Sequence, residues 1–131
     1  MSGESLLRLA LIGAGGAAGA VLRFAVSSWV QTRSGSIVYP FGTLSVNLTG
    51  CLLIGLLSGL ADNRSMFSAE TRSFLIIGGL GAFTTFSTFG NETLNLLRAG
   101  RLELALFNIG AQVFFGLALV WLGRMLAGLW G

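Results

Sequence analysis

The sequence contains neither histidine nor lysine, and its eight basic residues are all arginine. Imidazole is a frequent general base and a common metal ligand in proteins, so its absence excludes histidine-based catalysis and imidazole metal ligation. Cysteine occurs once, as Cys51, which excludes an intramolecular disulfide. Its neighbours Gly50, Leu52 and Leu53 favour a packed small side chain over a reactive thiol.

Charged residues are also few, at 10% of the 131 residues, whereas 53% are hydrophobic. A soluble domain carries about 25% charged residues. This composition, with a mean hydropathy of +0.81, therefore predicts a polytopic membrane protein. The net charge of +3 is too diffuse to indicate nucleic-acid binding. The first apolar stretch is long and rich in glycine and alanine, so we expect no cleavable signal peptide.

Four long apolar segments follow one another, each near the length of about 20 residues that a membrane-spanning helix needs. They cover residues 6–30, 42–60, 74–97 and 104–122, with short polar connections that leave no room for a soluble domain. The sequence therefore predicts an all-α integral membrane protein with four transmembrane helices, one domain over residues 1–131 and both termini on the same side. A protomer this small has little interior, so we expect it to form oligomers.

The arginines give no clear orientation in the membrane. Those on the side of the termini are Arg8, Arg64, Arg72 and Arg124, and those on the opposite side are Arg33, Arg98 and Arg101. Because orientation follows an excess of positive charge on one side, this balance favours a chain that inserts both ways. The alternative is that a few residues decide the orientation by signals that a count does not weigh.

Arg23 lies within the first span, nearer its second end. One interpretation is an arginine that extends along the helix to place its charge at the interface. The other is a cation that lines a wet vestibule and attracts anions, since charges inside a membrane usually mark such places. Position alone leaves both interpretations open.

Residues 13–19 of the first span formally match a dinucleotide-binding fingerprint. That fingerprint needs a βαβ unit and an acidic residue about 20 positions later, whereas the next acidic residue is Asp62, beyond a second apolar span. The same run places Gly15 and Gly19 at the small-residue spacing that lets membrane helices approach closely. Helix packing is therefore the better interpretation.

The third span carries an unusual polar run, residues 77–92, with four glycines, four hydroxyl side chains, an amide and a carboxylate. Phe83, Phe86 and Phe89 recur within it at every third position. Glycine costs about 1 kcal/mol relative to alanine in a helix, and β-branched threonine adds strain. Broken helices within a bilayer are tolerated only beside protein or a water-filled cavity. We therefore expect the third helix to break at mid-membrane, at a permeation or binding site.

Polar side chains also occur on the second and fourth spans. Thr43 and Asn47 are four residues apart, as are Asn108 and Gln112, so each pair shares one helical face. An amide in a membrane helix is often only a contact between helices, but three amides across two helices suggest a polar track. Phenylalanine rims are electropositive, so rims, hydroxyls and amides together suit weak binding of a small dehydrated anion. Packed or lipid-facing phenylalanines are the alternative.

Three stretches match a known family: GAVLR at 19–23, GTLSVN at 42–47 and GGLGAFTTFSTF at 78–89. With these motifs in a short four-span chain, the sequence resembles the Fluc/CrcB fluoride channel family over essentially its whole length. The resemblance implies a fluoride-selective passive channel in the bacterial cytoplasmic (inner) membrane. Such a channel exports cytoplasmic fluoride, lowers its toxicity and needs no enzyme chemistry.

The resemblance also implies an antiparallel, dual-topology homodimer, in agreement with the balanced arginines. Each of its two pores would use residues of both subunits. The family's pore positions fall on Asn47, Phe86, Phe89, Ser87 and Thr88, and its vestibule arginine falls on Arg23. Asn108 and Gln112 align only by counting from Gly100, and Thr43 is predicted to line the pore on the face of Asn47.

A structural sodium ion at the dimer centre is the cofactor that the resemblance implies. Its ligands would be the backbone carbonyls of Gly81 and Thr84, two from each subunit, and carbonyl oxygens suit a hard cation. The chain departs from the family's usual Gly-Gly-Leu here, since it has Gly81, Ala82 and Phe83. Backbone ligation does not depend on the side chain, but Ala82 lacks the conformational freedom of glycine. Glu92 matches an acidic residue of the family, with either helix-end hydrogen bonding or ion handling as its role.

Two other functions are compatible with a small four-span chain. A drug/proton antiporter would need an ionisable acid inside its first helix, but Glu4 precedes that helix. A partner subunit that conducts nothing would be free to lose its pore residues. This chain keeps Phe86, Phe89 and Asn47, so we expect it to be competent alone.

Overall fold

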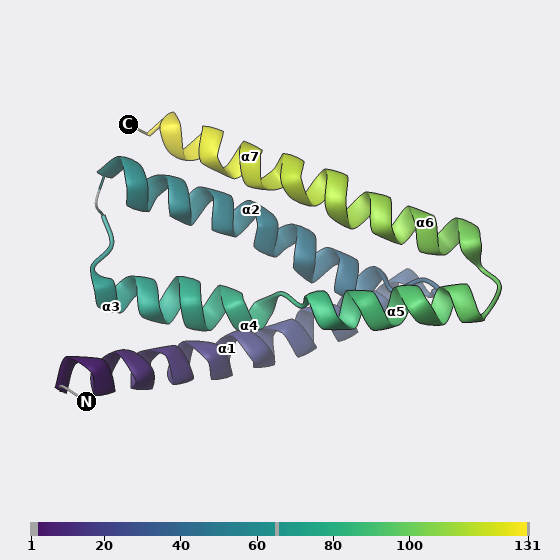
Figure 1. Ribbon diagram of the computed structural model, residues 1–131, viewed down its shortest axis with the longest axis horizontal. Coiled ribbons are helices and arrows are strands. Elements are labelled where there is room, and N and C mark those ends of the chain that lie inside the picture. Colours follow the sequence, from purple (N-terminus) through teal and green to yellow (C-terminus); the bar gives the residue numbers. More distant parts are fainter. Residues whose placement is uncertain (1–2, 65, 131) are drawn as a thin grey trace.

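The computed structural model describes residues 3–64 and 66–130, which fold into four helical rods (Figure 1). The first two rods are α1 (Gly3–Ser34) and α2 (Phe41–Arg64). The third consists of α3 (Ala69–Arg72), the π-helical segment η1 (Ser73–Leu80) and α4 (Gly81–Phe83), and after an interruption α5 (Phe86–Arg98). The fourth consists of α6 (Leu102–Gly110), the π-helical segment η2 (Ala111–Phe115) and α7 (Gly116–Gly128).

Four segments are long and apolar enough to cross a membrane: Gly3–Ser34, Phe41–Asp62, Ala69–Arg98 and Leu102–Gly128. The prediction of four such helices is confirmed. Each helix extends a few residues beyond the apolar stretch seen in the sequence, because hydropathy marks only the hydrocarbon-compatible part. The positive φ angles of Gly35 (65°) and Gly100 (71°), which glycine adopts readily, allow the chain to turn directly after α1 and α5.

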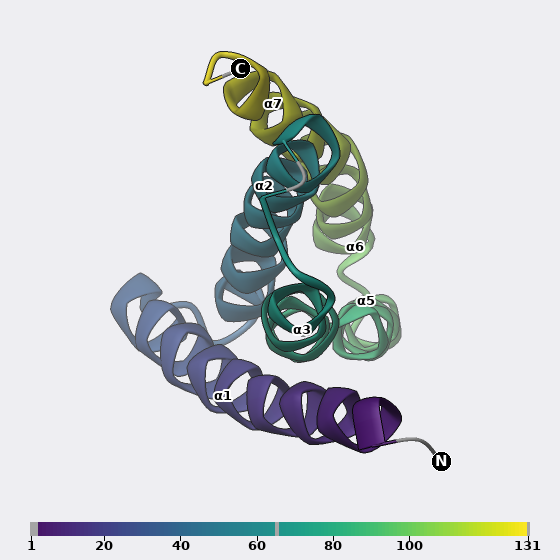
Figure 2. The same ribbon diagram turned by 90° about the vertical axis from the view of Figure 1, so that its left-hand side faces the viewer.

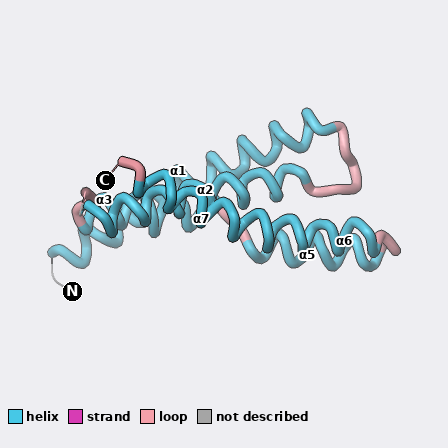
Figure 3. The backbone as a smooth tube through the Cα atoms, turned by 90° about the horizontal axis from the view of Figure 1, so that it is seen from above, coloured by secondary structure: helices cyan, strands magenta, loops and turns pink. Residues whose placement is uncertain are grey.

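The third rod lies between α1 and the pair formed by α2 and α7, and both ends of the chain lie at the same end of the bundle (Figure 1). Seen from that end, α1 crosses one side of the third rod, while α2, α6 and α7 lie on the other (Figure 2). At the opposite end two helix pairs diverge, α1 with α2 and α5 with α6 (Figure 3).

Glycines bring the rods into backbone contact. A Cβ atom at Gly15 would collide with the carbonyl of Phe74, and one at Gly19 would collide with the carbonyl of Gly79. The helix-packing interpretation of these two glycines is therefore confirmed. A second close approach joins α2 to α7, where a Cβ atom at Gly55 would meet the carbonyl of Val120.

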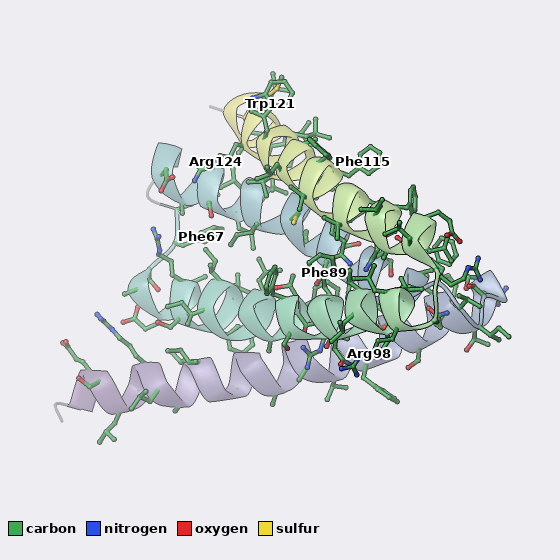
Figure 4. All side chains as sticks on the ribbon, turned by 45° about the vertical axis from the view of Figure 1, so that its right-hand side comes forward. Phe67, Phe89, Arg98, Phe115, Trp121 and Arg124 are labelled. Atoms are coloured by element: carbon green, nitrogen blue, oxygen red, sulfur yellow. The ribbon has the colours of Figure 1, made fainter. Side chains whose placement is uncertain are left out.

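The protomer buries few large side chains. Val46 and Asn108 are the largest of the described side chains that are fully buried. Many large apolar side chains are exposed instead, and those of Phe115 and Trp121 extend away from the other helices (Figure 4). Such a surface suits a lipid solvent, in which apolar side chains gain little by turning inward.

Gly19→Ala tests the contact between α1 and η1. The added methyl group has to displace the main chain of Gly79, so we expect the free energy of unfolding in detergent to fall by about 1–3 kcal/mol. Gly13→Ala is the matched control, because a Cβ atom there has no neighbour within 4 Å. Circular dichroism melting of the two variants measures the difference, and equal melting temperatures would contradict the packing.

Candidate functional site

The helix of the third rod ends at Phe83, and α5 begins at Phe86. Thr84 (φ −94°, ψ 160°) and Thr85 (φ −152°, ψ 114°) between them are extended. Thr85 Oγ1 accepts the N–H of Thr88 (3.2 Å) and so caps α5. The structure therefore places an interruption inside the polar run 77–92, and its depth in a membrane stays a prediction.

Asn47 on α2 pairs with the interrupted backbone. Its Oδ1 accepts the N–H of Thr85 (2.8 Å), and its Nδ2 donates to the carbonyl of Thr85 (3.0 Å). Asn47 Nδ2 also donates to Gln112 Oε1 on η2 (2.7 Å). Gly50, one turn further along α2, leaves room for Thr84, because a Cβ atom there would collide with Thr84 Cγ2. One amide thus satisfies both main-chain groups of Thr85, which a continuous helix would otherwise satisfy.

A cavity of about 400 Å³ lies beside the interruption. Four of the predicted pore residues line it, namely Asn47, Phe86, Phe89 and Gln112, and most of its other lining residues are apolar. The rings of Phe86 and Phe89 lie 5.4 Å apart with an interplanar angle of 57°. Phe86 is 83% exposed. Phe89 is buried, and its side chain points from α5 toward the neighbouring helices (Figure 4). This cavity is the candidate site.

Ser87 and Thr88 stand at the start of α5, outside the lining of this cavity. Thr85 Oγ1 donates to Thr88 Oγ1 (2.9 Å) and lies 3.4 Å from Ser87 Oγ. The proton of the Thr88 hydroxyl is therefore not used by this bond. Both hydroxyls are exposed, so they are available to a ligand at the N-terminal end of α5.

A second, more polar cavity of about 500 Å³ opens between α1, α2 and α5. Its lining residues are Ser27, Ser28, Gln31, Thr32, Pro40, Thr43 and Glu92. Thr43 Oγ1 donates to Glu92 Oε1 (2.7 Å), and Glu92 Oε2 is buried without a hydrogen-bond partner among the described residues. The structure thus gives Glu92 a contact with α2 and separates Thr43 from the cavity that Asn47 lines.

A hydrogen-bond network connects the fourth rod to the interruption. Asn108 is fully buried, and its Oδ1 accepts from Tyr39 Oη (3.1 Å) and from Gln112 Nε2 (3.3 Å). Its Nδ2 donates to Thr93 Oγ1 (3.0 Å). The structure therefore brings Asn47, Gln112 and Asn108 into one network. With its oxygen accepting two bonds and no exposed surface, Asn108 does not reach the cavity directly.

Sequence reasoning missed Tyr39 and Thr93. One signal was available for Tyr39, because it is the only tyrosine in a chain with ten phenylalanines. An isolated phenol in so apolar a chain suggests a buried hydrogen-bond partner. Thr93 gave no comparable signal, since it is one of several hydroxyl residues in α5.

The main chain at the interruption offers carbonyl oxygens to a cation. In a continuous helix the N–H groups of Thr85 and Thr88 would donate to the carbonyls of Gly81 and Thr84. Here they donate to Asn47 Oδ1 and Thr85 Oγ1. The described residues contain no cluster of three or more metal-ligating side chains. The donor set at Gly81 and Thr84 is therefore backbone oxygen, which hard cations prefer.

Arg23 is half-buried on α1 and lines neither of the two cavities. It lies on the turn before Ser27, which does line the polar cavity. Arg23 is thus one helical turn from a residue of the polar cavity, and its vestibule role stays a prediction.

These features define a class: a helical membrane protein with four spanning segments, the third interrupted beside a cavity that an asparagine of the second helix lines. The chain belongs to the CrcB family, because the family model described as "CrcB-like protein, Camphor Resistance (CrcB)" matches residues 10–124. The resemblance seen in the sequence is thereby confirmed, and the chain is a multi-pass membrane protein.

Several relatives are similar in sequence to this chain over most of its length. A protein of Hydrogenovibrio crunogenus named "Fluoride-specific ion channel FluC" is 47% identical over 123 residues, covering 94% of this chain and 92% of the relative. "Fluoride-specific ion channel FluC 1" of Methanosarcina acetivorans is 46% identical over 117 residues, covering 89% and 88%. A "Fluoride-specific ion channel FluC" of Pseudomonas putida is 45% identical over 118 residues, covering 90% and 94%. These names describe ion channels, which is not an enzymatic activity.

Titration of Tyr39 tests its buried placement. Burial raises the pKa of the Tyr39 phenol above its ordinary value of about 10, and the negative charge of Glu92 raises it further. The unfolded chain then loses its phenolic proton first, so stability falls as the pH rises from about 10 through the folded pKa. Tyrosinate absorbance reports this one group, because the chain has a single tyrosine.

We expect the folded protein to form tyrosinate at a higher pH than the denatured protein does. Tyr39→Phe is the control and should show no tyrosinate signal. Equal midpoints for folded and denatured protein would mean that the phenol is not buried.

Proposed function

We propose that this chain is a fluoride-selective passive channel, which exports cytoplasmic fluoride and lowers its toxicity. The observation that carries the proposal is the interrupted third rod, where Asn47, Phe86 and Gln112 meet at one cavity in a chain of the CrcB family. Relatives named as fluoride-specific channels support it. The protein would act in the bacterial cytoplasmic membrane, where hydrogen fluoride enters neutral, ionises in the near-neutral cytoplasm and is trapped until a channel releases the anion.

The cavity supports weak binding of a dehydrated anion. The rims of Phe86 and Phe89 present positive ring edges, and the free hydroxyl proton of Thr88 adds a donor at the start of α5. The positive end of the helix dipole lies at the same place. Asn47, Phe86, Phe89, Ser87, Thr88 and Gln112 form the proposed path, with Thr43 and Arg23 on the side of the polar cavity. Conduction requires several weak binding sites, one after another along the pore.

An antiparallel homodimer with dual topology would complete this path. The carbonyls at the interruption lack their helical donors, and such groups do not face lipid. Phe86, which is 83% exposed beside the cavity, would be covered by the partner. The balanced arginines support two opposite orientations of one sequence. Two pores, each with residues of both subunits, follow from the symmetry of such a dimer.

We also propose a structural sodium ion at the centre of this dimer. The backbone carbonyls of Gly81 and Thr84 from both subunits would hold it, and their freedom from helical donors fits that role. Ala82, in place of the family's glycine, follows Gly81 within the α4 turn, where its helical backbone needs no glycine. The ion would supply a fixed positive charge that binds the two interrupted helices together.

Fluoride efflux from liposomes that contain the purified protein tests the function. A fluoride electrode should record rapid release of fluoride while chloride, measured in parallel, is retained. Phe86→Ile and Asn47→Ser remove a ring rim and an amide, so we expect each to lower the initial rate by about tenfold or more.

The matched controls are Phe115→Ile and Asn95→Ser, which change exposed residues outside the cavity. Native mass spectrometry should give twice the protomer mass of 13.7 kDa for every variant. An intact dimer without fluoride release would leave the family fold without this function, and the antiporter or partner-subunit interpretation would then lead. Unchanged rates in Phe86→Ile and Asn47→Ser would remove these residues from the pore.

Replacement of sodium tests the proposed ion separately. A ligand that binds only the folded dimer stabilises it by mass action, so the melting temperature should be higher in sodium chloride than in N-methylglucamine chloride at equal ionic strength. Potassium chloride is the control for a general effect of small cations. The same melting temperature in all three salts would argue against a bound sodium ion.

A further inference from the structure

The hydrogen bonds that lead from the protein core to the cavity beside the interruption all point the same way, from donor to acceptor. Thr93 Oγ1 donates to the carbonyl of Phe89 (2.7 Å), and a carbonyl can only accept. Because its proton is used in this bond, the Thr93 oxygen is left to accept, and it does so from Asn108 Nδ2 (3.0 Å). The oxygen of the Asn108 amide is therefore turned away from Thr93 and toward Gln112.

The same direction continues to the interruption. Asn108 Oδ1 accepts from Gln112 Nε2 (3.3 Å), and Gln112 Oε1 accepts from Asn47 Nδ2 (2.7 Å). Asn47 Oδ1 then accepts the N–H of Thr85 (2.8 Å), which can only donate. Main-chain groups of the third rod thus fix both ends of this relay, and each amide between them has its oxygen and nitrogen oriented by its neighbours.

Reversal of any one amide in the relay places a donor against a donor or an oxygen against an oxygen. Buried polar groups without partners are unfavourable, so one orientation of the amides is strongly preferred. Gln112 lines the cavity, and this orientation leaves the second hydrogen of its Nε2 for a ligand while Asn47 holds its oxygen. A reversed Gln112 would present its oxygen, which repels an anion.

We propose that Thr93 and Asn108 are positioning residues that orient the Gln112 amide, so that the cavity offers its remaining N–H to an anion. Asn47 uses both of its N–H groups on Thr85 and Gln112 and holds that orientation from the other side. This proposal rests on the proposed fluoride conduction. Thr93 is 7% exposed and Asn108 is 0% exposed, and neither lines the cavity. They act through Gln112 and do not touch the conducted ion.

Tyr39 strengthens the relay from its outer side. Its hydroxyl gives Asn108 Oδ1 a second donor (3.1 Å). Gln31 holds the loop that carries it, since Gln31 Nε2 donates to the carbonyls of Ser36 (2.6 Å) and Tyr39 (3.1 Å). The ring packs on Phe107, with ring centroids 5.4 Å apart. Removal of this hydroxyl weakens the orientation of Asn108 without reversing it, because Gln112 still donates to the same oxygen.

Single-channel currents in planar lipid bilayers, recorded as a function of fluoride concentration, test the proposal on the full chain. Thr93→Val keeps the shape of the side chain but loses the hydroxyl, so we expect the half-saturating fluoride concentration to rise about fivefold or more. Thr93→Ser keeps the hydroxyl and should restore the wild-type value. A purely structural role would lower the number of active channels and leave the concentration dependence of each channel unchanged.

Thr49→Val is the matched control, because Thr49 is exposed on the same helix as Asn47 and lies outside the relay. If wild type conducts and Thr93→Val has the half-saturating concentration of Thr49→Val, the proposal is overturned. If Thr93→Val does not fold, Tyr39→Phe decides. It keeps the ring contacts and should raise the half-saturating concentration about twofold. This effect is smaller because Tyr39→Phe leaves no buried polar group without a partner. An unchanged half-saturating concentration in Tyr39→Phe would overturn the proposal.

A wild type that carries no fluoride current would refute the proposed function, and nuclear magnetic resonance would then decide the relay alone. In detergent micelles, Thr93→Val should shift the amide proton resonance of Thr85 and the side-chain NH₂ resonances of Gln112, and Thr93→Ser should not. Unshifted resonances in Thr93→Val would overturn the relay independently of conduction.

Discussion

The pairing of the Asn47 amide with the main chain of Thr85 is the interaction on which the rest of the cavity depends. An interrupted helix in apolar surroundings leaves peptide groups without partners, at a cost of several kcal/mol for each group. Asn47 satisfies two such groups and so fixes α2 against the start of α5. Gln112 joins the same amide from η2, and three rods therefore meet at one point. The cavity, with the amides of Asn47 and Gln112 in its wall, follows from that meeting.

The rest of the protomer is held by contacts between backbones more than by a hydrophobic core. Glycines at 15 and 19 place α1 directly on η1, and Gly55 does the same for α2 and α7. Lipid chains are as apolar as leucine, so burial of leucine gains little and close packing gains more. The large apolar side chains are accordingly spread over the surface. Polar groups, which lipid cannot satisfy, are gathered instead into a small number of networks.

The sequence predicted the four spans because hydropathy over about 20 residues reports the solvent that a helix meets. It also predicted an interruption within residues 77–92, since glycine and threonine are poor helix formers. It did not place that interruption at Thr84 and Thr85, because the partner that stabilises it lies 38 residues away on another helix. Thr43 shows the same limit. It shares a face with Asn47, but four residues span about 6 Å along the axis, and Thr43 meets Glu92 at a different cavity.

Composition and local pattern alone determined the class, the number of spans, the family and the region of the interruption, because each depends on residues close together in the chain. Tertiary structure decided which polar groups meet. Asn108 is 69 residues from Tyr39 and 15 residues from Thr93 along the chain. The direction of the relay depends on that meeting, since a hydroxyl or an amide donates or accepts according to what its partner can do. No local pattern carries that information.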